Sequence, residues 1–316
     1  MPQPTVPPLG DAPTFLDFPL CEDLAELEPG IAILGIPFSY HYAGDQSPWP
    51  QDEAPAAIRQ ASPRLSVAPE HWDFDVGGPV LAGTSVPVVD CGDAGGDASD
   101  PGAHYDCAEE AIRQIVARGA LPIVMGGDHG VPIPVFRGLR DQGPITLVHV
   151  DAHLDWRNDV GGVTEGYSSP IRRASELDWI DGIYQLGLRA QGSARAEEVE
   201  AAKAYGSELF TAYDVHDRGI AAILERIPDG GTYYLTIDAD GLDPAVMPAV
   251  LGPAPGGLSF EQVRQLIHGL TAKGRVIGMD IVEVAPKFDV NGITAVTAGQ
   301  LILNLIGTTI RAGYFD

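Results

Sequence analysis

Short runs of apolar residues recur along the chain, and the longer segments between them mix polar and apolar positions. Seven of these runs are continuous rather than alternating, which is the pattern of parallel strands covered on both faces. The strands predicted in this way are 31–36, 86–89, 122–125, 145–150, 183–186, 233–237 and 276–281.

Helical periodicity fills several of the intervening segments. Apolar residues between 105 and 116 share one helix face, and this segment ends at Gly119. Ser259 and Gln262 have the spacing of a capping box, and a last helix is predicted over 295–308. Because strands and helices alternate, we predict one α/β domain over 30–316 with a mostly parallel sheet, preceded by an N-terminal extension over 1–29.

Composition and charge restrict the possible functions. The 316 residues include 44 Asp and Glu against 19 Lys and Arg, which gives a formal net charge of −25, and 45% are hydrophobic. This apolar content is sufficient for a large core, whereas the acidity argues against nucleic-acid binding and against a polybasic membrane anchor. Three scattered cysteines, no apolar run of about 20 residues and no visible secretory signal lead us to expect a soluble cytoplasmic protein.

Three polar segments follow directly after predicted strands, and each carries potential metal ligands. Alternate side chains of an extended strand point the same way, so residues two apart within one segment can converge on one point. Two glycines before His129 allow the backbone to turn and bring that imidazole alongside. The candidate ligands are His129, Asp151, His153, Asp155, Asp238 and Asp240.

Two imidazoles and four carboxylates at one edge of a sheet predict a binuclear metal site. Four carboxylates packed together repel strongly unless cations neutralise them. Mixed nitrogen and oxygen ligands suit Mn²⁺, Ni²⁺ or Zn²⁺, and a water shared by two such ions ionises near neutral pH and becomes a nucleophile. The site therefore predicts a hydrolase. We expect Asp128 and Asp243 to have turn or supporting roles, and His149, assigned to the opposite strand face, to be structural.

Two long segments without regular periodicity also follow predicted strands. They cover 39–53 and 241–257, and the second is rich in Gly and Pro. Loops of this length in a compact domain are usually functional. Since both leave the carboxyl ends of strands, we expect them to rim the crevice that holds the site.

The three polar segments resemble the signatures of the ureohydrolase family, which includes arginases and agmatinases. Residues 279–286 are similar to a further motif of the agmatinase branch, and 31–38 with 57–59 to its N-terminal pattern. The resemblance implies the three-layer α/β/α arginase-like fold, two Mn²⁺ or Ni²⁺ ions per chain, hydrolysis of a guanidino compound to urea and an amine, and a homo-oligomer, trimeric or hexameric. The matching sequences are Gly-Gly-Asp-His at 126–129, Asp-Ala-His-Leu-Asp at 151–155 and Asp-Ala-Asp-Gly-Leu-Asp-Pro at 238–244.

The resemblance also implies roles for individual residues. Asp151 and Asp238 would bridge the two ions, and Asp155 would in addition orient the attacking water. Glu283 matches the carboxylate that binds the guanidinium in this family, and forked N–H donors do pair well with a carboxylate. The ligands implied for the first ion are His129, Asp151, Asp155 and Asp238, and those for the second are Asp151, His153, Asp238 and Asp240.

Two loops depart from the agmatinase pattern. Where that branch has His-Gly-Thr-Pro-Phe-Arg-Arg, residues 167–173 read Tyr-Ser-Ser-Pro-Ile-Arg-Arg, so the imidazole that usually donates a proton is missing. Residues 47–53 replace an Arg-Pro-Gly-Ala-Arg-like stretch. Agmatine is therefore not the expected substrate.

Other residues must then contact the substrate and move the proton. Tyr167 and Ser168 are the predicted contacts beside Glu283. His41 is a candidate for both tasks, because a histidine titrates near neutral pH, and an ordinary loop histidine is the alternative. The adjacent Tyr40 and Tyr42, like Tyr167, are further candidates for the proton transfer.

Several alternatives stay open from the sequence. The small cationic substrate can be a guanidino acid, an alkylated guanidine or a biguanide, and Arg172 and Arg173 are candidate contacts for an anionic group. A different class is a non-catalytic subunit that supports a homologous active partner, although all six ligands and Glu283 are retained. A deacetylase of the related single-zinc fold would need a His-His pair near the metal, which the chain lacks.

Overall fold

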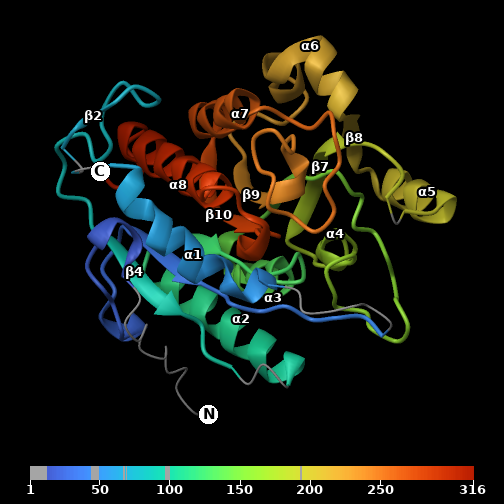
Figure 1. Ribbon diagram of the computed structural model, residues 1–316, viewed down its shortest axis with the longest axis horizontal. Coiled ribbons are helices and arrows are strands. Elements are labelled where there is room, and N and C mark those ends of the chain that lie inside the picture. The colour runs from blue at the N-terminus through green and yellow to red at the C-terminus, as the bar shows by residue number, and fades with distance from the viewer. Residues whose placement is uncertain (1–12, 44–49, 67, 69, 97–99, 193) are drawn as a thin grey trace.

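The computed structural model describes residues 13–43, 50–66, 68, 70–96, 100–192 and 194–316. Within these ranges, eight strands form one central sheet, and every pairing in it is parallel. The strands are β1 (Ile31–Gly35), β4 (Val88–Asp93), β5 (Leu121–Met125), β6 (Ile145–Val150), β7 (Ile180–Leu188), β8 (Glu208–Thr211), β9 (Thr232–Asp238) and β10 (Arg275–Val282). Their order across the sheet is β4-β1-β5-β10-β9-β6-β7-β8. The labelled strands β4, β10, β9, β7 and β8 follow one another in this order in Figure 1.

All seven strands predicted from continuous apolar runs are present, with shifted ends for β4 and a longer β7. The periodicity missed β8 and a small antiparallel pair, β2 (Trp72–Asp73) and β3 (Gly78–Pro79). The reason is burial. The strand β8 lies at the edge of the sheet and buries only Phe210 fully, so it has no continuous apolar run. The two strands of the small pair are only two residues long.

Helices cover both faces of the sheet. Buried side chains form two clusters, to which α1, α6, α7 and α8 contribute on one face and α2, α3, α4 and α5 on the other. This confirms the predicted three-layer α/β/α arrangement. The helices are α1 (Ala54–Ala61), α2 (Pro101–Ala117), α3 (Pro132–Gly138), α4 (Pro170–Ala174), α5 (Ala196–Tyr205), α6 (Ala212–Leu224), α7 (Phe260–Lys273) and α8 (Ile293–Arg311).

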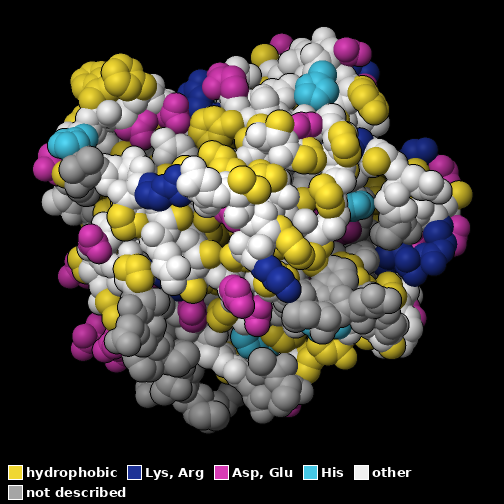
Figure 2. Space-filling model, in the orientation of Figure 1, with side chains coloured by type: hydrophobic (Ala, Val, Ile, Leu, Met, Phe, Trp, Pro, Cys, Tyr) yellow, Lys and Arg dark blue, Asp and Glu magenta, His cyan; other side chains and the backbone are white. Residues whose placement is uncertain are grey.

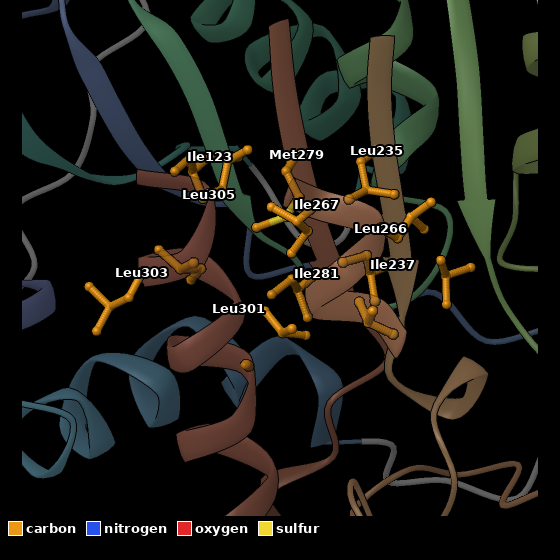
Figure 3. Close-up of a cluster of buried hydrophobic side chains, with 14 of the residues drawn as sticks. Ile123, Leu235, Ile237, Leu266, Ile267, Met279, Ile281, Leu301, Leu303 and Leu305 are labelled. Atoms are coloured by element: carbon orange, nitrogen blue, oxygen red, sulfur yellow. The ribbon is translucent and has the colours of Figure 1, made fainter. Parts of the chain in front are cut away.

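Helices α7 and α8 hold the middle of the sheet from one side. Leu266 and Ile267 of α7 lie with Leu301 of α8 against Ile237 and Ile281 of the central strands (Figure 3). All five side chains are fully buried, and each contributes on the order of 2 kcal/mol through removal of apolar surface from water. The predicted capping box is present, since the Ser259 Oγ accepts the Gln262 N–H at 3.2 Å.

The last helix combines length with an apolar composition. Ile293–Arg311 is long and apolar enough to cross a membrane, yet 78% of its most apolar window is buried inside the protein. Its side chains pack against the sheet and against α1 and α7. We therefore describe α8 as a core helix.

The described part of the N-terminal segment packs onto the edge of the sheet. The Phe15 N–H donates to the Asp90 carboxylate at 2.8 Å, and the Cys21 N–H donates to the Asp90 carbonyl at the same distance. Arg59 of α1, which is fully buried, binds the same carboxylate at 2.9 Å. Phe15 itself is fully buried in the core, so residues 13–29 are integrated into the fold.

The surface reflects the acidic composition. On the face shown in Figure 2, Asp and Glu side chains are spread over the surface and Lys and Arg side chains lie among them, several close together at the right of the view. Hydrophobic side chains gather at the corner occupied by β2, where Trp72 and Phe74 are 62% and 90% exposed.

Candidate metal centre

The predicted ligands lie at the carboxyl edge of four neighbouring strands. β5, β10, β9 and β6 are consecutive in the sheet. His129 follows β5, Glu283 follows β10, Asp238 ends β9 and Asp151 follows β6. Since the strands are parallel and in register, their ends bring these side chains to one place.

A turn that contains Gly126 and Gly127 positions His129. A Cβ atom at Gly127 would lie 1.7 Å from the Phe38 carbonyl oxygen, so only glycine fits this close approach. The Asp128 carboxylate stabilises the turn, because it accepts the Gly130 N–H at 2.8 Å and the Tyr40 N–H at 2.6 Å. Asp128 thus has the supporting role expected of it and also ties the 39–43 loop to the site.

One group of ligand atoms surrounds the His129 imidazole. Its Nδ1 lies 3.1 Å from Asp151 Oδ2, 3.0 Å from Asp155 Oδ2 and 3.0 Å from Asp238 Oδ2. None of these contacts has the geometry of a hydrogen bond, although the nitrogen is buried. One nitrogen facing three carboxylate oxygens at equal distance is the donor set of a cation rather than a hydrogen-bonding arrangement.

A second group surrounds the His153 imidazole. Its Nδ1 lies 3.4 Å from Asp151 Oδ1 and 3.1 Å from Asp240 Oδ2. Asp151 therefore presents Oδ2 to the first group and Oδ1 to the second. This split is the geometry expected of a carboxylate that bridges two cations. The six predicted ligands are thus brought together. Two sets of side chains lie close enough together to hold a metal ion: His129, His149, Asp151 and Asp155 form one, and Asp151, His153 and Asp240 form the other.

The electrostatics of the site call for positive charge. Burial and the charges of Asp240 and Asp151 raise the pKa of Asp238 well above its usual value. Burial and Asp151 also raise the pKa of Asp155 to about 7. Burial disfavours a charged His129, but three surrounding carboxylates outweigh it and raise the pKa of this imidazole. The metal-free site thus retains protons where cations would otherwise compensate the carboxylates.

The structure corrects the placement of His149. It lies two residues before Asp151, which puts both side chains on the same strand face, and its Nε2 is 2.9 Å from Asp151 Oδ2. The Gln185 side-chain N–H lies 3.0 Å from His149 Nδ1 and also donates to the Leu154 carbonyl. Because Gln185 donates to Nδ1, Nε2 carries the hydrogen and donates to the carboxylate. His149 therefore orients a predicted metal ligand, which is the usual task of a residue behind a metal site.

Two site residues have backbone conformations that side chains rarely adopt. Asp155 has a φ of 50° and Glu283 a φ of 63°. Residues other than glycine are held in this region only when the surrounding structure compensates the strain, and such residues concentrate at functional sites. Both carboxylates are thereby aimed into the same space.

Glu283 is held through both of its carboxylate oxygens. Its Oε1 accepts the His129 N–H at 2.8 Å, and its Oε2 accepts the side-chain N–H of Gln51 at 2.9 Å. Burial raises the pKa of Glu283, and these two hydrogen bonds oppose the rise. The carboxylate still has free lone pairs for a planar cation.

A cavity of about 430 Å³ opens above the ligands. Tyr167 and Ser168, the predicted substrate contacts, line it, and the Tyr42 hydroxyl accepts the Ser168 N–H at 3.0 Å. Among the described residues, those that line the cavity include Tyr42 but not His41. The full lining consists of Tyr42, Ala43, His129, His153, Asp155, Arg157, Val160, Tyr167, Ser168, Asp238, Asp240, Leu251, Gly252 and Glu283.

Comparison with known proteins agrees with this geometry. The model of the Arginase family matches residues 29–307. The chain belongs to the arginase family. A guanidinopropionase from Pseudomonas aeruginosa is 31% identical over 95% of this chain and 92% of its own. An agmatinase from Photorhabdus laumondii is 30% identical over 92% and 91%. The solved proclavaminate amidino hydrolase from Streptomyces clavuligerus superposes with a TM-score of 0.80 at 26% identity, over 95% and 97% of the two chains.

Membership of the arginase family confirms three predictions. The fold is the arginase-like α/β fold, the chain is a ureohydrolase, and it acts on the C–N bond of guanidino compounds. Use of a binuclear divalent metal centre is typical of the arginase family, and the His and Asp cluster of this chain could hold such a centre.

The predicted cationic contacts are not among the described residues that line the cavity of this arginase-family chain. Arg172 and Arg173 both pair with Glu176, at 3.0 and 3.1 Å, and neither is among the described lining residues. The arginine that does line the cavity is Arg157, whose Nε binds Glu198 at 2.8 Å. The sequence offered one signal for it, since Arg157 lies two residues after Asp155.

Sequence patterns also missed the anchor of the second long loop. Arg189 is buried, and its guanidinium donates to the backbone carbonyls of Gly187, Asp240 and Ala254 at 2.9, 2.5 and 2.7 Å. Asp243 stabilises the same loop by accepting the Gly256 N–H at 2.7 Å. An arginine that binds only carbonyls has no sequence motif, because its partners are backbone atoms.

Proposed function

We propose that this chain hydrolyses a guanidino compound other than agmatine to urea and an amine, using two Mn²⁺ or Ni²⁺ ions per chain. The observation that carries the proposal is the division of the Asp151 carboxylate between two imidazole-containing donor groups. These two groups would hold a pair of divalent ions, which would supply a nucleophile at neutral pH by lowering the pKa of a bound water.

The protein residues have separate tasks in this reaction. We assign Asp151 and Asp238 as the shared ligands, His129 and Asp155 to one side, and His153 with Asp240 to the other. Asp155 accepts a hydrogen bond from the attacking water and so orients it. Glu283 binds the guanidinium, which fixes the central carbon beside the ligands and favours charge delocalisation toward the nitrogens.

The bond changes require one proton for the departing amine. The water oxygen bonds to the guanidinium carbon, a C–N bond breaks, and the nitrogen leaves as an amine after it receives the proton. Since residue 167 is a tyrosine, the donor must be another group than the usual loop histidine. Asp155, which accepts the hydrogen bond from the attacking water, takes the proton that the water loses and passes it to the leaving nitrogen. His41 stays a second candidate for this transfer.

The cavity lining favours a substrate with a short, partly apolar substituent. Val160, Leu251 and the rings of Tyr42 and Tyr167 supply apolar surface, and the two rings lie 4.4 Å apart. This observation supports an alkylated guanidine or a biguanide as the second candidate substrate class. Arg157 at the same cavity supports a guanidino acid, such as those on which the similar guanidinopropionase acts by its name.

We also propose that the protein is a cytoplasmic homo-oligomer, a trimer or hexamer, and the alternative is a hetero-oligomer with a homologous subunit. The exposed pair of Trp72 and Phe74, whose rings lie 6.5 Å apart, supports a subunit contact at the β2 corner. Light scattering of the wild type and of the Trp72→Ser and Phe74→Ser double variant tests this. A wild-type monomer would contradict it.

Urea release from the purified chain tests the proposed function. The apoprotein is loaded with Mn²⁺ or Ni²⁺, bound metal is measured by elemental analysis, and urea is assayed across guanidino acids, alkylated guanidines, biguanides and agmatine. We expect two ions per chain and turnover of at least one compound in preference to agmatine. Two bound ions with no urea from any compound would instead support a non-catalytic subunit, and a preference for agmatine would overturn the substrate assignment.

A further inference from the structure

Gln51 reaches the proposed guanidinium-binding carboxylate from a distant part of the chain. It lies in a short 3-10 helix, η3 (Pro50–Glu53), directly before α1, whereas Glu283 follows β10. Its side chain is 1% exposed, and its Nε2 donates to Glu283 Oε2 at 2.9 Å. The residue lies in the 47–53 stretch that departs from the agmatinase pattern.

The orientation of the Gln51 amide is dictated by Glu283. A carboxylate only accepts hydrogen bonds, so the amide must turn its NH₂ group toward it. The amide oxygen is then left buried without a hydrogen-bond partner among the described residues. A buried acceptor without a partner is unfavourable. The amide therefore keeps the hydrogen bond from its NH₂ group to Glu283 at the cost of a hydrogen bond to its oxygen.

The remaining contacts of Glu283 leave its side chain little freedom. Its second oxygen accepts the His129 N–H, and its own N–H donates to the Gly127 carbonyl at 2.8 Å. With a φ of 63°, its backbone is in a region that needs such support. Gln51 provides the one side-chain hydrogen bond to this carboxylate among the described residues.

We propose that Gln51 is a positioning residue that fixes Glu283 for guanidinium binding and thereby couples η3 to substrate affinity. The inference rests on the proposed function only in taking Glu283 as the guanidinium contact. Gln51 does not line the cavity, so it acts through Glu283. Loss of its N–H should weaken binding of every guanidinium compound and leave the metal ligands in place.

Gln51→Met tests this with a side chain of similar size that cannot donate. The matched control is Gln114→Met on α2, where the Gln114 Nε2 donates to Glu110 at 2.7 Å, far from the site. With the metal-loaded enzyme, we expect KM for the substrate and the inhibition constant of the guanidinium ion to rise together by at least about tenfold, with a smaller change in kcat. Metal content should be unchanged, and the control should match the wild type.

A double variant separates positioning from general damage. In a Glu283→Gln background, Gln51→Met should have little further effect on guanidinium binding, because the two residues act as one unit. Additive effects, or an unchanged inhibition constant in Gln51→Met alone, would overturn the inference. If Gln51→Met fails to fold, Gln51→Asn, whose amide is too short to reach Glu283, takes its place with the same expectations.

Direct binding keeps this inference distinct from the proposed function. The guanidinium ion is titrated calorimetrically into metal-loaded wild type and Gln51→Met at concentrations well below those that denature. Tighter binding by the wild type supports the role of Gln51 even if no compound is turned over. Equal binding by a wild type that does release urea refutes the role of Gln51 and leaves the proposed function intact.

Discussion

The imidazole of His149 donates a hydrogen bond through Nε2 to Oδ2 of Asp151, at 2.9 Å, from inside the core. Behind it, the Ser207 hydroxyl donates to the side-chain amide oxygen of Gln185 at 3.2 Å, which leaves the Gln185 NH₂ group facing His149. This chain of contacts sets both the tautomer of the imidazole and the orientation of the carboxylate that faces both donor groups. The sheet interior thus prepares the site before any ion binds.

Removal of a shared ligand should abolish metal binding and turnover together. We expect Asp151→Ala and Asp238→Ala to hold fewer than two ions per chain and to release no urea, since each carboxylate is assigned as a ligand shared by both ions. Elemental analysis and the urea assay measure this, with Asp106→Ala on the exposed side of α2 as the control. Full activity in either site variant would refute its assignment as a bridge.

Removal of the supporting imidazole should weaken metal binding without eliminating it. His149→Phe leaves all six ligands but loses the hydrogen bond to Asp151, and we expect metal affinity to fall by about 10- to 100-fold. Competition with a chelator measures the change. The control is His268→Phe, because the His268 Nε2 lies 2.8 Å from Asn304 Oδ1 on the helical layer. Equal affinities in the two variants would show that His149 is only a packing residue.

Stabilisation by metal should increase with pH. Burial and Asp151 raise the pKa of Asp155 from 3.8 to about 7 in the metal-free protein. Between these pH values the folded site holds a proton that the unfolded chain has released, so the free energy of unfolding falls as pH rises through this window. Metal replaces that proton. The Tm increase caused by Mn²⁺ should therefore be larger at about pH 8 than at about pH 5.5, and a constant increase would contradict the proton competition.

Loss of Arg189 should release the 241–257 loop. Arg189→Met leaves several buried carbonyls of this loop without a donor, and we expect the free energy of unfolding to fall by about 3 kcal/mol. Urea denaturation measures the loss, and KM should rise because Leu251 and Gly252 line the cavity. Arg226→Met, which removes an exposed pair with Glu208, should leave both quantities unchanged. A stable Arg189→Met variant would indicate that water replaces the guanidinium.

The sequence was most informative where burial is uniform. Continuous apolar runs predicted the central strands, because a parallel strand covered on both faces must be apolar at every position. The same argument failed for β8 at the sheet edge, where only Phe210 of the strand is buried. The ligand set followed from spacing, since Asp151, His153 and Asp155 all follow one strand directly.

Contacts between distant segments could not be predicted. The hydrogen bond from Gln51 to Glu283 joins residues that are 232 positions apart in the sequence, so no local sequence pattern predicts it. His149 was assigned to the wrong face although its spacing from Asp151 contained the answer. The acceptors of the Arg189 guanidinium are backbone carbonyls, which every residue type has, so no sequence pattern predicts them. The position of His41 outside the described cavity lining depends on loop geometry, which periodicity does not specify.

The neighbouring positions of β5, β10, β9 and β6 have an evolutionary consequence. The reacting edge is fixed by the hydrogen-bond ladder of the sheet, whereas the walls of the cavity come from connecting segments such as 157–168 and 251–252. Sequence changes in those segments can therefore change which nitrogenous substrate the cavity accepts, without disturbing the residues at the carboxyl edge of the strands. A single ancestral scaffold can in this way diversify into enzymes that share a reaction and differ in substrate specificity.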